Sequence, residues 1–471
     1  MTSRPAASNR TDDVMAASSA PVSRNLPRPR LWSLRAVDVY AFLAGNGVLI
    51  AAMWIRHGGM DEFATIAGTL TAIGQLTALY GTYGALIGLV LMSRSPWLDQ
   101  TFGTDRLAWA HRWVGFATVW LLLAHGLFTT VGWAFTDERS ILGEGWALLT
   151  TYPFILMTTV GMGMFVAVAV TSVRAARRAI SYETWHFIHF YAYLAIALTF
   201  AHQLILGADF ASDPMARIYW SALYVLTIAS IVVFRFGHPI RLSLRHRMRV
   251  ANVITEGPGI VSIYVTGRQL DRLAVRAGQY FMWRFLARDG WWRAHPYSLS
   301  AAPNGEYLRL TVKDLGDDSR EIQRLPIGTR VAIEGPYGAL TDLRRSRRRV
   351  LLVAGGIGIT PLRALMEELP AGPGDLSLIY RARSWDEVVF RDELDTLASL
   401  RGATVTYLVG RRGREVPSDP LGAGWLRHLV PDVADRDVYI CGPDRMMSLV
   451  CRSLRALHVP DAQIHLERFA Y

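Results

Sequence analysis

The sequence predicts a multi-domain membrane protein: a six-helix transmembrane bundle, then a β-barrel domain, then an α/β domain with a doubly wound parallel sheet. Three observations predict this order. The chain has 471 residues, which is too long for one compact domain. Residues before about 240 form mostly apolar blocks, whereas later residues mix charged and apolar side chains, as soluble domains do. In that later part, short alternating stretches come first, and strands that alternate with helices follow.

These changes in composition place four segments along the chain. Residues 1–35 are rich in Ser, Ala, Pro and Arg and have no apolar run, so we expect a disordered cytoplasmic tail rather than a signal peptide. The other boundaries that we expect are 36–240 for the transmembrane bundle, 248–343 for the β-barrel domain and 349–471 for the α/β domain.

Six apolar stretches are long enough to cross the roughly 30 Å hydrocarbon core of a bilayer. They lie at about 36–55, 64–92, 111–133, 150–173, 185–206 and 218–236. Arginines gather in the tail, in the second and fourth loops and after the sixth stretch, whereas the other loops are acidic. Because positive charge stays on the cytoplasmic side, we expect a multi-pass protein of the cytoplasmic membrane with both termini in the cytoplasm.

The net charge of +11 does not indicate a nucleic-acid partner, because its source is the set of arginines that flanks the apolar stretches. Only two cysteines are present, Cys441 and Cys451, so the sequence has no disulfide framework and no spacing typical of zinc or iron–sulfur sites. Both cysteines lie in the soluble half, which fits a reducing cytosol.

Two of the apolar stretches each carry a pair of widely spaced histidines. His111 and His125 are 14 residues apart in the third stretch, and His189 and His202 are 13 residues apart in the fifth. At about 1.5 Å per residue, the members of each pair lie roughly 20 Å apart along a helix, one towards each side of the membrane. An ionisable side chain in a membrane helix indicates a functional site, and imidazole is a common ligand of haem iron.

The third and fifth stretches cross the membrane in the same direction, so His111 pairs with His189 on the inner side and His125 with His202 on the outer side. Two bis-histidine haems would then stack across the bilayer. Fourteen residues return to within about 40° of the same helix face, but thirteen miss it by about 140°. The fifth stretch must therefore be locally distorted, or its imidazoles must reach their irons from different sides. The alternative is polar contacts between helices or a proton path.

The expected β-barrel domain contains a segment suited to a flavin. Stretches such as RVANVITEG, GIVSIYVTG, LRLTVKD and RVAIEGPYG predict its strands. The segment RAHPYSLS brings together Arg293, His295, Tyr297 and Ser298. An aromatic ring can stack on a flavin, a hydroxyl can bond the flavin edge, and a cation can meet a phosphate. The alternative is an ordinary strand with a proline at its edge.

A second segment of that domain is suited to an anion. Lys313, Gly316 and Ser319 lead into the start of a helix in VKDLGDDSREI. The N-terminus of a helix favours negative charge, so these residues form a candidate phosphate cradle. The alternative is a simple capped helix.

The expected α/β domain carries glycines where parallel sheets bind nucleotides. The segment GGIGITP, with Gly355, Gly356 and Gly358, follows a buried strand and precedes a helix, and ICGP follows a later strand about 85 residues on. Glycines let the backbone approach a pyrophosphate, and ligands of open sheets bind beyond the carboxyl ends of the strands. Arg381 and Arg383 follow the second strand, where the 2′-phosphate of NADPH would lie. Exposed strand-end arginines are the alternative, so NADH stays possible.

GGIGITP, ICGP and HPYSLS resemble the FAD- and NAD(P)H-binding module of the ferredoxin–NADP reductase type. The six apolar stretches with their histidine spacings resemble the ferric reductase transmembrane domain that NADPH oxidases and ferric-chelate reductases share. The two resemblances together cover nearly all of residues 36–471. They imply that two b-type haems have as axial ligands His111, His125, His189 and His202.

The resemblance also implies roles for residues of the soluble half. Those that would hold FAD are His295, Pro296, Tyr297 and Ser298. Those at the NAD(P)H pyrophosphate would be Gly355, Gly356, Gly358, Thr360 and Pro361, and those beside the nicotinamide Cys441, Gly442 and Pro443. The aromatic residue that covers the flavin falls on Phe469, and Tyr471 is the alternative two residues farther on. His186, one turn before His189, is an extra histidine that we interpret as interfacial.

These features predict an oxidoreductase that moves electrons from cytosolic NAD(P)H through FAD and two haems to a small acceptor outside, either O₂ or ferric iron. Short outer loops favour a diffusible acceptor, and we expect no obligate protein partner. One alternative is a haem-free, membrane-anchored flavin reductase that feeds quinone or a partner protein. Another is an electron-donor subunit for a periplasmic enzyme.

Overall fold

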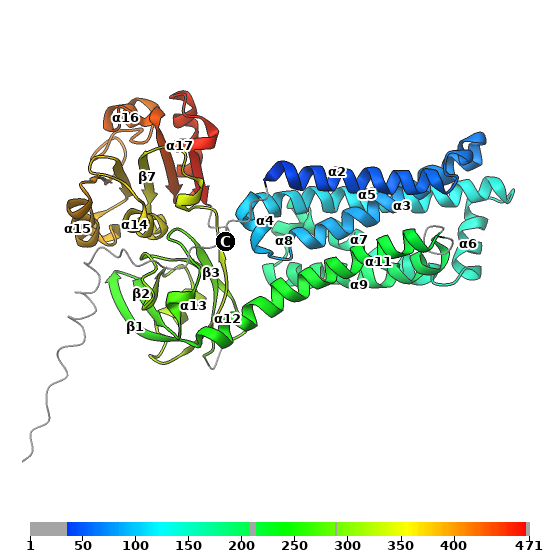
Figure 1. The fold of residues 1–471 in the computed structure, drawn as a ribbon, viewed down its shortest axis with the longest axis horizontal. Coiled ribbons are helices and arrows are strands. Elements are labelled where there is room, and N and C mark those ends of the chain that lie inside the picture. The colour runs from blue at the N-terminus through cyan, green and yellow to red at the C-terminus, as the bar shows by residue number, and fades with distance from the viewer. Residues whose placement is uncertain (1–34, 208–212, 288–289, 468–471) are drawn as a thin grey trace, which may run out of the picture. The chain divides into compact units, whose positions relative to one another are not determined.

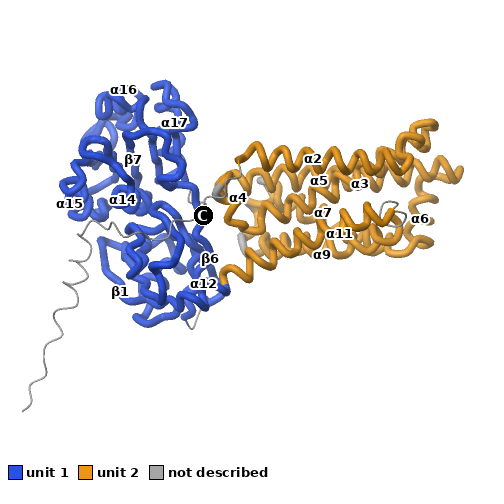
Figure 2. Tube along the Cα trace, viewed as in Figure 1, with its two compact units in different colours: residues 1–30, 240–471 blue, residues 31–239 orange. Residues whose placement is uncertain are grey.

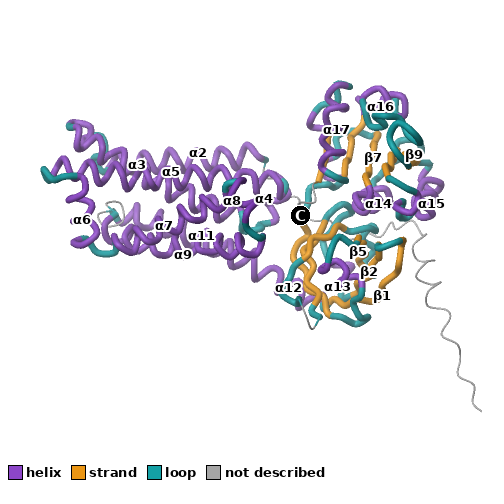
Figure 3. The backbone as a smooth tube through the Cα atoms, turned by 180° about the vertical axis from the view of Figure 1, so that it is seen from behind, coloured by secondary structure: helices purple, strands orange, loops and turns teal. Residues whose placement is uncertain are grey.

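The computed structural model of the chain describes residues 35–207, 213–287 and 290–467. One compact unit covers Leu31–Pro239, and the other includes Ile240–Tyr471 (Figure 2). The first unit is helical, and the second contains two β-sheets with their helices (Figure 3). The expected tail lies outside the described residues except for Arg35.

Six helices are long and apolar enough to cross a membrane, and they confirm the six expected spans. Their axes run side by side within the bundle (Figure 1). They are α2 (Ala36–Arg56), α3 (Ile66–Leu91), α5 (Thr104–Thr136), α7 (Ile155–Ser172), α9 (Tyr182–Leu206) and α11 (Pro214–Ile231). The last of them continues through a π-helical turn at Val232–Gly237 into α12 (His238–His246).

The helix α5 begins seven residues before the expected span. Asp105 and Arg106 are charged, so the apolar stretch used to predict the span begins only after them. An acidic residue in the first turn nevertheless favours a helix start there. The sequence also did not predict three short helices in the connections, since none is long enough to give a clear period. They are α4 (Pro96–Phe102), α6 (Ile141–Thr151) and α8 (Arg174–Ala179).

Glycines let α3 and α5 approach each other closely. A Cβ atom at Gly74 would overlap the hydroxyl of Thr129, and a Cβ at Gly132 would overlap that of Thr71. The helices α7 and α9 approach in the same way, because a Cβ at Gly161 would lie 3.1 Å from the carbonyl oxygen of Ala195. Small residues at such contacts are typical of helices that associate in lipid, where close packing replaces the hydrophobic effect.

The first sheet of the second unit has six antiparallel strands in the order β4-β3-β6-β1-β2-β5. The strands are β1 (Met248–Gly257), β2 (Ile260–Thr266), β3 (Tyr280–Phe285), β4 (His295–Ser298), β5 (Tyr307–Lys313) and β6 (Arg330–Tyr337). A bridge between Leu299 and Leu310 joins the two outer strands, so the sheet closes on itself around a hydrophobic core. The short helix α13 (Asp317–Gln323) follows β5.

The second sheet has five parallel strands in the order β11-β10-β7-β8-β9. They are β7 (Arg349–Gly355), β8 (Leu376–Ala382), β9 (Thr404–Val409), β10 (Arg436–Cys441) and β11 (Ile464–Glu467). The helices α14 (Ile359–Glu368) and α15 (Arg391–Arg401) pack on one face, and α16 (Ala423–Leu429) and α17 (Asp444–Ala456) on the other. This arrangement confirms the expected doubly wound sheet.

Candidate functional site

The four histidines of the bundle lie in two pairs between α5 and α9. The ring centres of His111 and His189 are 5.9 Å apart, and those of His125 and His202 are 6.1 Å apart. The helix α9 is unbroken from Tyr182 to Leu206. Both histidine pairs therefore form without a local distortion of this helix, which was one of the two expected explanations of the 13-residue spacing. The side chains of His189 and His202 therefore reach their partners from different sides of α9.

Backbone carbonyls of α3 orient both histidines of α5. The Nδ1 atom of His111 donates to the oxygen of Gly88 at 3.0 Å, and Nδ1 of His125 donates to the oxygen of Gly74 at 3.0 Å. A carbonyl oxygen can only accept, so these bonds fix the tautomer with the proton on Nδ1. In both rings the Nε2 lone pair is then available to a metal, as it is in metal-bound histidines with an outer hydrogen-bond partner.

The distance between the rings in each pair fits a metal ion between two imidazoles. Two metal–nitrogen bonds of about 2 Å each, together with two ring radii, span about 6 Å. In the described part of the chain, no three His, Cys, Asp or Glu side chains gather into a metal site. A pair of histidines could therefore hold only a metal that brings its other ligands with it, and iron in a porphyrin does so.

The backbones of α5 and α9 do not pack directly against each other, whereas α3 packs along α5 and α7 along α9. The Nδ1 atoms of His189 and His202 are buried and have no hydrogen-bond partner among the described residues. The extra histidine, His186, stacks edge-on against Phe190 with ring centres 4.6 Å apart and belongs to neither pair.

In the second unit, a cavity of about 450 Å³ brings together residues of the antiparallel sheet, of the start of α13, and of the turn and helix that follow β7. Eight of the residues that the sequence predicted to bind a cofactor line it: His295, Pro296, Tyr297, Ser298, Lys313, Gly316, Ser319 and Thr360. The hydroxyl of Ser298 is buried and has no partner among the described residues, and Gly316 has open space where a side chain would begin. Both features fit a bound flavin nucleotide that uses the hydroxyl and approaches the glycine.

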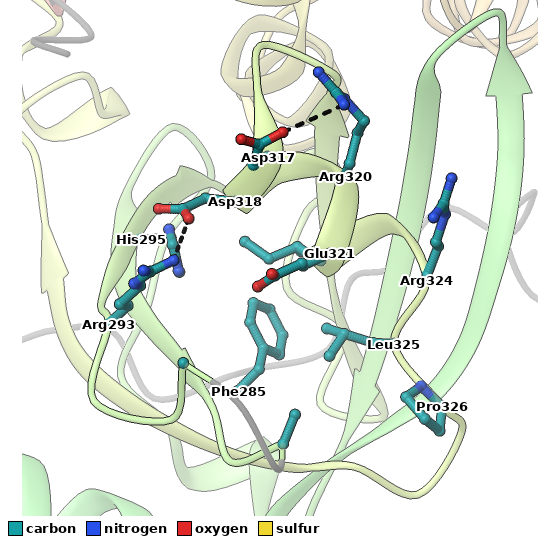
Figure 4. Close-up of a pocket in the computed structure, with 13 residues that line it drawn as sticks. Phe285, Arg293, His295, Asp317, Asp318, Arg320, Glu321, Arg324, Leu325 and Pro326 are labelled. Atoms are coloured by element: carbon teal, nitrogen blue, oxygen red, sulfur yellow. Dashed lines mark hydrogen bonds and ion pairs between the residues drawn. The ribbon is translucent and has the colours of Figure 1, made fainter.

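A second cavity of about 630 Å³ adjoins the first and shares with it His295, Asp317 and Asp318 (Figure 4). Arg293 pairs with Asp318 at the mouth of this cavity. Burial is the main cause that lowers the pKa of His295, while Asp318 acts in the opposite direction. His295 is therefore neutral near pH 7, and the charge of Arg293 also lowers its pKa.

The predicted phosphate cradle has a structural component. The hydroxyl of Ser319 donates to the oxygen of Gly316 at 2.8 Å and accepts from the backbone of Leu315 at 2.8 Å, so it holds the turn before α13. Lys313 lies 3.5 Å from Glu387. The helix α13 has only seven residues, so its dipole is weak. An anion at this edge of the cavity would depend more on the open backbone at Gly316 and on the charge of Lys313.

The two glycine motifs of the parallel sheet meet at the carboxyl ends of β7 and β10. A Cβ at Gly358 would overlap the backbone of Cys441, and a Cβ at Gly355 would overlap Met446. Gly356 has φ +53° and nothing within 4 Å of a would-be Cβ, so its backbone faces open space. Gly442 and Pro443 lie against this turn, and Thr360 and Pro361 begin α14 beside it. This edge could hold a pyrophosphate close to the main chain.

Cys441 is fully buried, and the structure places beside it a residue that the sequence reasoning missed. Burial raises the pKa of the Cys441 thiol, and the charge of Glu467 raises it further. Glu467 pairs in register with Cys441 across β10 and β11, and a Cβ at Gly338 would lie 3.2 Å from its Oε2. This role could not be predicted from the sequence, because Glu467 is a single acidic residue that belongs to no recognisable motif. Phe469 and Tyr471 lie outside the described residues.

Arg381, near the end of β8, and Arg383, directly after that strand, have different surroundings. The guanidinium of Arg381 donates to the backbone oxygens of Leu408 at 2.8 Å and Gly410 at 2.6 Å, so it ties together the ends of β8 and β9. Arg383 is exposed. Burial is the first cause that lowers the pKa of Arg381, followed by the charges of Arg412 and Arg383. The sequence analysis had not included Arg412, although RRGR follows β9 after a single glycine.

The fold and site define a multi-pass membrane oxidoreductase that uses NAD(P)H and has an FAD-binding domain. Three family models match the chain in this order: a ferric reductase-like transmembrane component at residues 77–200, an FAD-binding domain at 245–341 and an oxidoreductase NAD-binding domain at 352–452. The chain therefore has a ferric reductase-like transmembrane component followed by FAD- and NAD-binding domains, which is the architecture that NADPH oxidases and ferric reductases share.

The soluble half resembles known reductases. Ferredoxin–NADP reductase B of Sorangium cellulosum is 34% identical over 189 residues, which are 37% of this chain and 77% of that protein. The glycine betaine monooxygenase reductase subunit of Chromohalobacter salexigens is 26% identical over 48% of this chain and 64% of its own length, less than two thirds. The FAD/NAD-binding domain of a nitric oxide dioxygenase from Vibrio cholerae is 25% identical, with a TM-score of 0.41, over 48% of this chain and 99% of that domain.

Proposed function

We propose that this protein carries electrons from cytosolic NAD(P)H across the cytoplasmic membrane to a one-electron acceptor outside, with FAD and two b-type haems as carriers. The observation that carries the proposal is the geometry of the two histidine pairs. Their ring centres are separated by 5.9 and 6.1 Å, and each pair joins the same two helices. Pairs of this kind at two depths of one bundle suit two electron carriers better than isolated polar contacts.

The histidines bind and insulate the haems in this proposal. His111 and His189 would hold the inner haem, and His125 and His202 the outer one. Two imidazoles would hold each haem iron and leave it no free ligand position, so an acceptor such as O₂ would take its electron without binding the metal. The bonds from Nδ1 to the α3 carbonyls keep the α5 rings in place without protonation at Nε2.

The soluble half would bring the reduced nicotinamide to the flavin. When bound, FAD accepts a hydride and releases electrons singly, and haem passes single electrons on. Tyr297 and Ser298 would orient the flavin in the 450 Å³ cavity, and Gly356 would admit the pyrophosphate of the nicotinamide nucleotide. Cys441, Gly442 and Pro443 would border the nicotinamide, with Phe469 or Tyr471 covering the flavin until it arrives.

Four further points belong to the proposal. The domain boundaries are 36–240, 248–343 and 349–471, after a tail at 1–35. Both termini are cytoplasmic, because arginines flank the spans on the side of the soluble half. The acceptor is O₂, which gives superoxide, or ferric iron, because the outer loops offer little room for a large substrate. NADPH is the favoured donor, since Arg383 and Arg412 lie near the expected place of a 2′-phosphate.

The first experiment is the visible absorption spectrum of the detergent-purified protein, oxidised and then reduced with NADPH. We expect the spectrum of two low-spin b-type haems per chain. The His111→Ala and His125→Ala variants should each lose one haem, whereas the matched control His186→Ala should keep both. A spectrum of flavin alone, from folded protein made with ample haem, would contradict the proposal and leave a haem-free flavin reductase.

The second experiment identifies the acceptor. The reduced protein in liposomes is exposed to O₂ or to chelated ferric iron, and superoxide and ferrous iron are measured separately. Rapid turnover with one of them is expected. Slow oxidation by both, together with a co-purifying protein, would instead indicate an electron-donor subunit.

A further inference from the structure

Directly after His202 in the sequence, Gln203 joins three helices of the bundle through its amide. Its Nε2 donates to the hydroxyl of Thr82 on α3 at 3.3 Å, and its Oε1 accepts from the hydroxyl of Tyr224 on α11 at 2.7 Å. Thr82 is 9% exposed and Tyr224 is 8% exposed. A polar amide in a lipid-spanning helix needs such partners, because no water replaces them in the hydrocarbon core.

The positions around α9 connect this amide to the histidine pairs. On a regular helix, the residue that returns to the face of His189 is the fourteenth one on, which is Gln203, to within about 40°. His202 falls about 140° away from that face. Because α9 is unbroken, the rotation of its last turns decides whether His202 meets His125. The amide of Gln203 fixes that rotation, since α3 and α11 hold it at both ends.

The two members of the outer pair are held differently. His125 has direct partners, because its Nδ1 donates to Gly74 at 3.0 Å and lies 3.2 Å from the hydroxyl of Thr129. The Nδ1 of His202 is buried and has no hydrogen-bond partner within the described ranges. His202 therefore lacks the outer hydrogen bond that usually orients a metal-bound imidazole.

Tyr224 is itself fixed in place. Its ring packs in a hydrophobic cluster with Ile50 and Trp220, and its ring centre lies 4.5 Å from that of Phe200 on α9. The helix α3, which supplies Thr82, also supplies the carbonyl that orients His125. The helix α3 therefore contacts both sides of the outer pair: His125 directly, and His202 through the neighbouring Gln203.

We propose that Gln203, clamped between Thr82 and Tyr224, is a positioning residue that turns His202 towards His125 and so completes the axial ligation of the outer haem. This inference rests on the proposed function, because it presupposes a haem at the outer pair. The Gln203 amide would orient the His202 ring, which a direct hydrogen bond to that ring does at most metal-bound histidines.

The test uses the full-length protein in detergent, reduced with dithionite and exposed to carbon monoxide. Iron with two histidine ligands has no free position for CO, so the wild type should keep its spectrum. In Gln203→Leu, the outer haem should lose His202 in part of the molecules. The reduced variant should then show high-spin absorption before CO is added and form a CO adduct afterwards, while the inner haem stays unchanged. His202→Ala gives the reference spectrum for complete loss of that ligand.

Two further comparisons keep the test decisive if Gln203→Leu folds poorly. Thr82→Val removes one partner with little change of shape and should bind CO, whereas Thr82→Ser keeps the hydroxyl and should not. Tyr224→Phe should bind CO, whereas Tyr219→Phe should not, because the Tyr219 hydroxyl bonds Asn46 at 3.0 Å instead. Two intact low-spin haems in Thr82→Val and Tyr224→Phe would overturn the inference alone, and a haem-free wild type would overturn the proposed function with it.

Discussion

The Nδ1 atom of His111 donates to the carbonyl oxygen of Gly88 at 3.0 Å, and this contact recurs one level farther along the bundle between His125 and Gly74. The two glycines are 14 residues apart, as are the two histidines, so α3 and α5 keep the same register over four turns. One helix thus orients the ligands that another helix carries. The glycines matter here for their backbone and for the space that they leave.

Substitution of the two glycines should have unequal effects. A Cβ at Gly74 would overlap the hydroxyl of Thr129 and lie 3.0 Å from its backbone nitrogen, whereas a Cβ at Gly88 would lie 3.7 Å from the His111 ring in ordinary contact. We expect Gly74→Ala to destabilise the bundle by about 1–3 kcal/mol, the usual cost of overpacking, and to lower the haem content. Gly88→Ala should retain both haems.

The measurements are haem per chain from the visible spectrum and the midpoint of thermal denaturation in detergent. An equal loss of haem and of thermal stability in both variants would show that overlap at the α3–α5 contact does not cause the loss.

The turn after β7 offers a second matched pair. Gly358→Ala places a Cβ on the backbone of Cys441, where nothing flexible can move away. Gly356→Ala meets no atom but forces alanine to φ +53°, which costs about 1–2 kcal/mol for a residue with a side chain. We therefore expect Gly358→Ala to lose binding of NADP⁺, measured by calorimetry, and Gly356→Ala to weaken it modestly. The reverse order would contradict the assigned geometry.

A buried ion pair joins the strand β5 to the helix α15. The guanidinium of Arg309, 3% exposed, donates to both carboxylate oxygens of Glu393 at 2.8 and 3.0 Å. Burial alone would raise the pKa of Glu393, but the hydrogen bonds from Arg309 and the charges of Arg309 and Arg363 outweigh it and lower the pKa below the usual 4.5. The pair therefore contributes stability that is fully present above pH 4.5 and is lost as the pH falls below it.

The expected outcome is a melting temperature that falls more steeply below about pH 4.5 in the wild type than in Glu393→Gln. At neutral pH the variant should be less stable by about 3–5 kcal/mol, because an uncompensated buried charge remains on Arg309. The release of FAD fluorescence on heating reports both effects. Asp392→Asn, at the exposed neighbouring position in the first turn of α15, is the control and should change both much less, by the few tenths of a kcal/mol that a charge at a helix start contributes. Parallel pH profiles of wild type and Glu393→Gln would show that this pair does not govern acid stability.

The sequence was informative where a physical period or a glycine fixes the outcome. The six spans follow from apolar length, and the parallel sheet follows from strands that alternate with helices. The strand β3 was not predicted, because Tyr280 and Met282, on its less buried face, are aromatic and apolar and hide the two-residue alternation. The short strand β11 was missed for lack of length.

The candidate site divides along a similar line. The cavity gathers Tyr297, Lys313 and Thr360 from segments far apart in the sequence, and their motifs indicated them. The roles of Gly74 and Gly88 could not be predicted, because both act through their backbone carbonyl oxygens and every residue type has such an oxygen. Arg381 shows the converse, since its position suggested a phosphate ligand but its guanidinium holds backbone oxygens.

The two cysteines should be inert in the native protein. Cys441 is fully buried and Cys451 is 9% exposed, and burial with the charge of Glu467 raises the pKa of Cys441. The thiolate is the reactive form, so a maleimide at about pH 7 should label the native protein far more slowly than the denatured protein, which should take two labels. Mass spectrometry of labelled peptides checks this. Rapid native labelling of Cys441 would show that the β10 edge opens in solution.

Loss of Arg381, near the end of β8, and loss of Arg383, directly after β8, should have different effects. The exposed Arg383 is free to meet a 2′-phosphate, and a charge-assisted hydrogen bond is worth about 1.5–3 kcal/mol, or roughly a 10- to 100-fold change in affinity. Arg383→Ala should therefore raise KM for NADPH by about that factor and leave KM for NADH nearly unchanged. Arg381→Met instead removes bonds to the backbone of β9, so it should lower the melting temperature and affect both nucleotides alike. Steady-state kinetics with each nucleotide and thermal denaturation distinguish the two cases. A selective loss of NADPH in Arg381→Met, with no selectivity change in Arg383→Ala, would reverse the assignment.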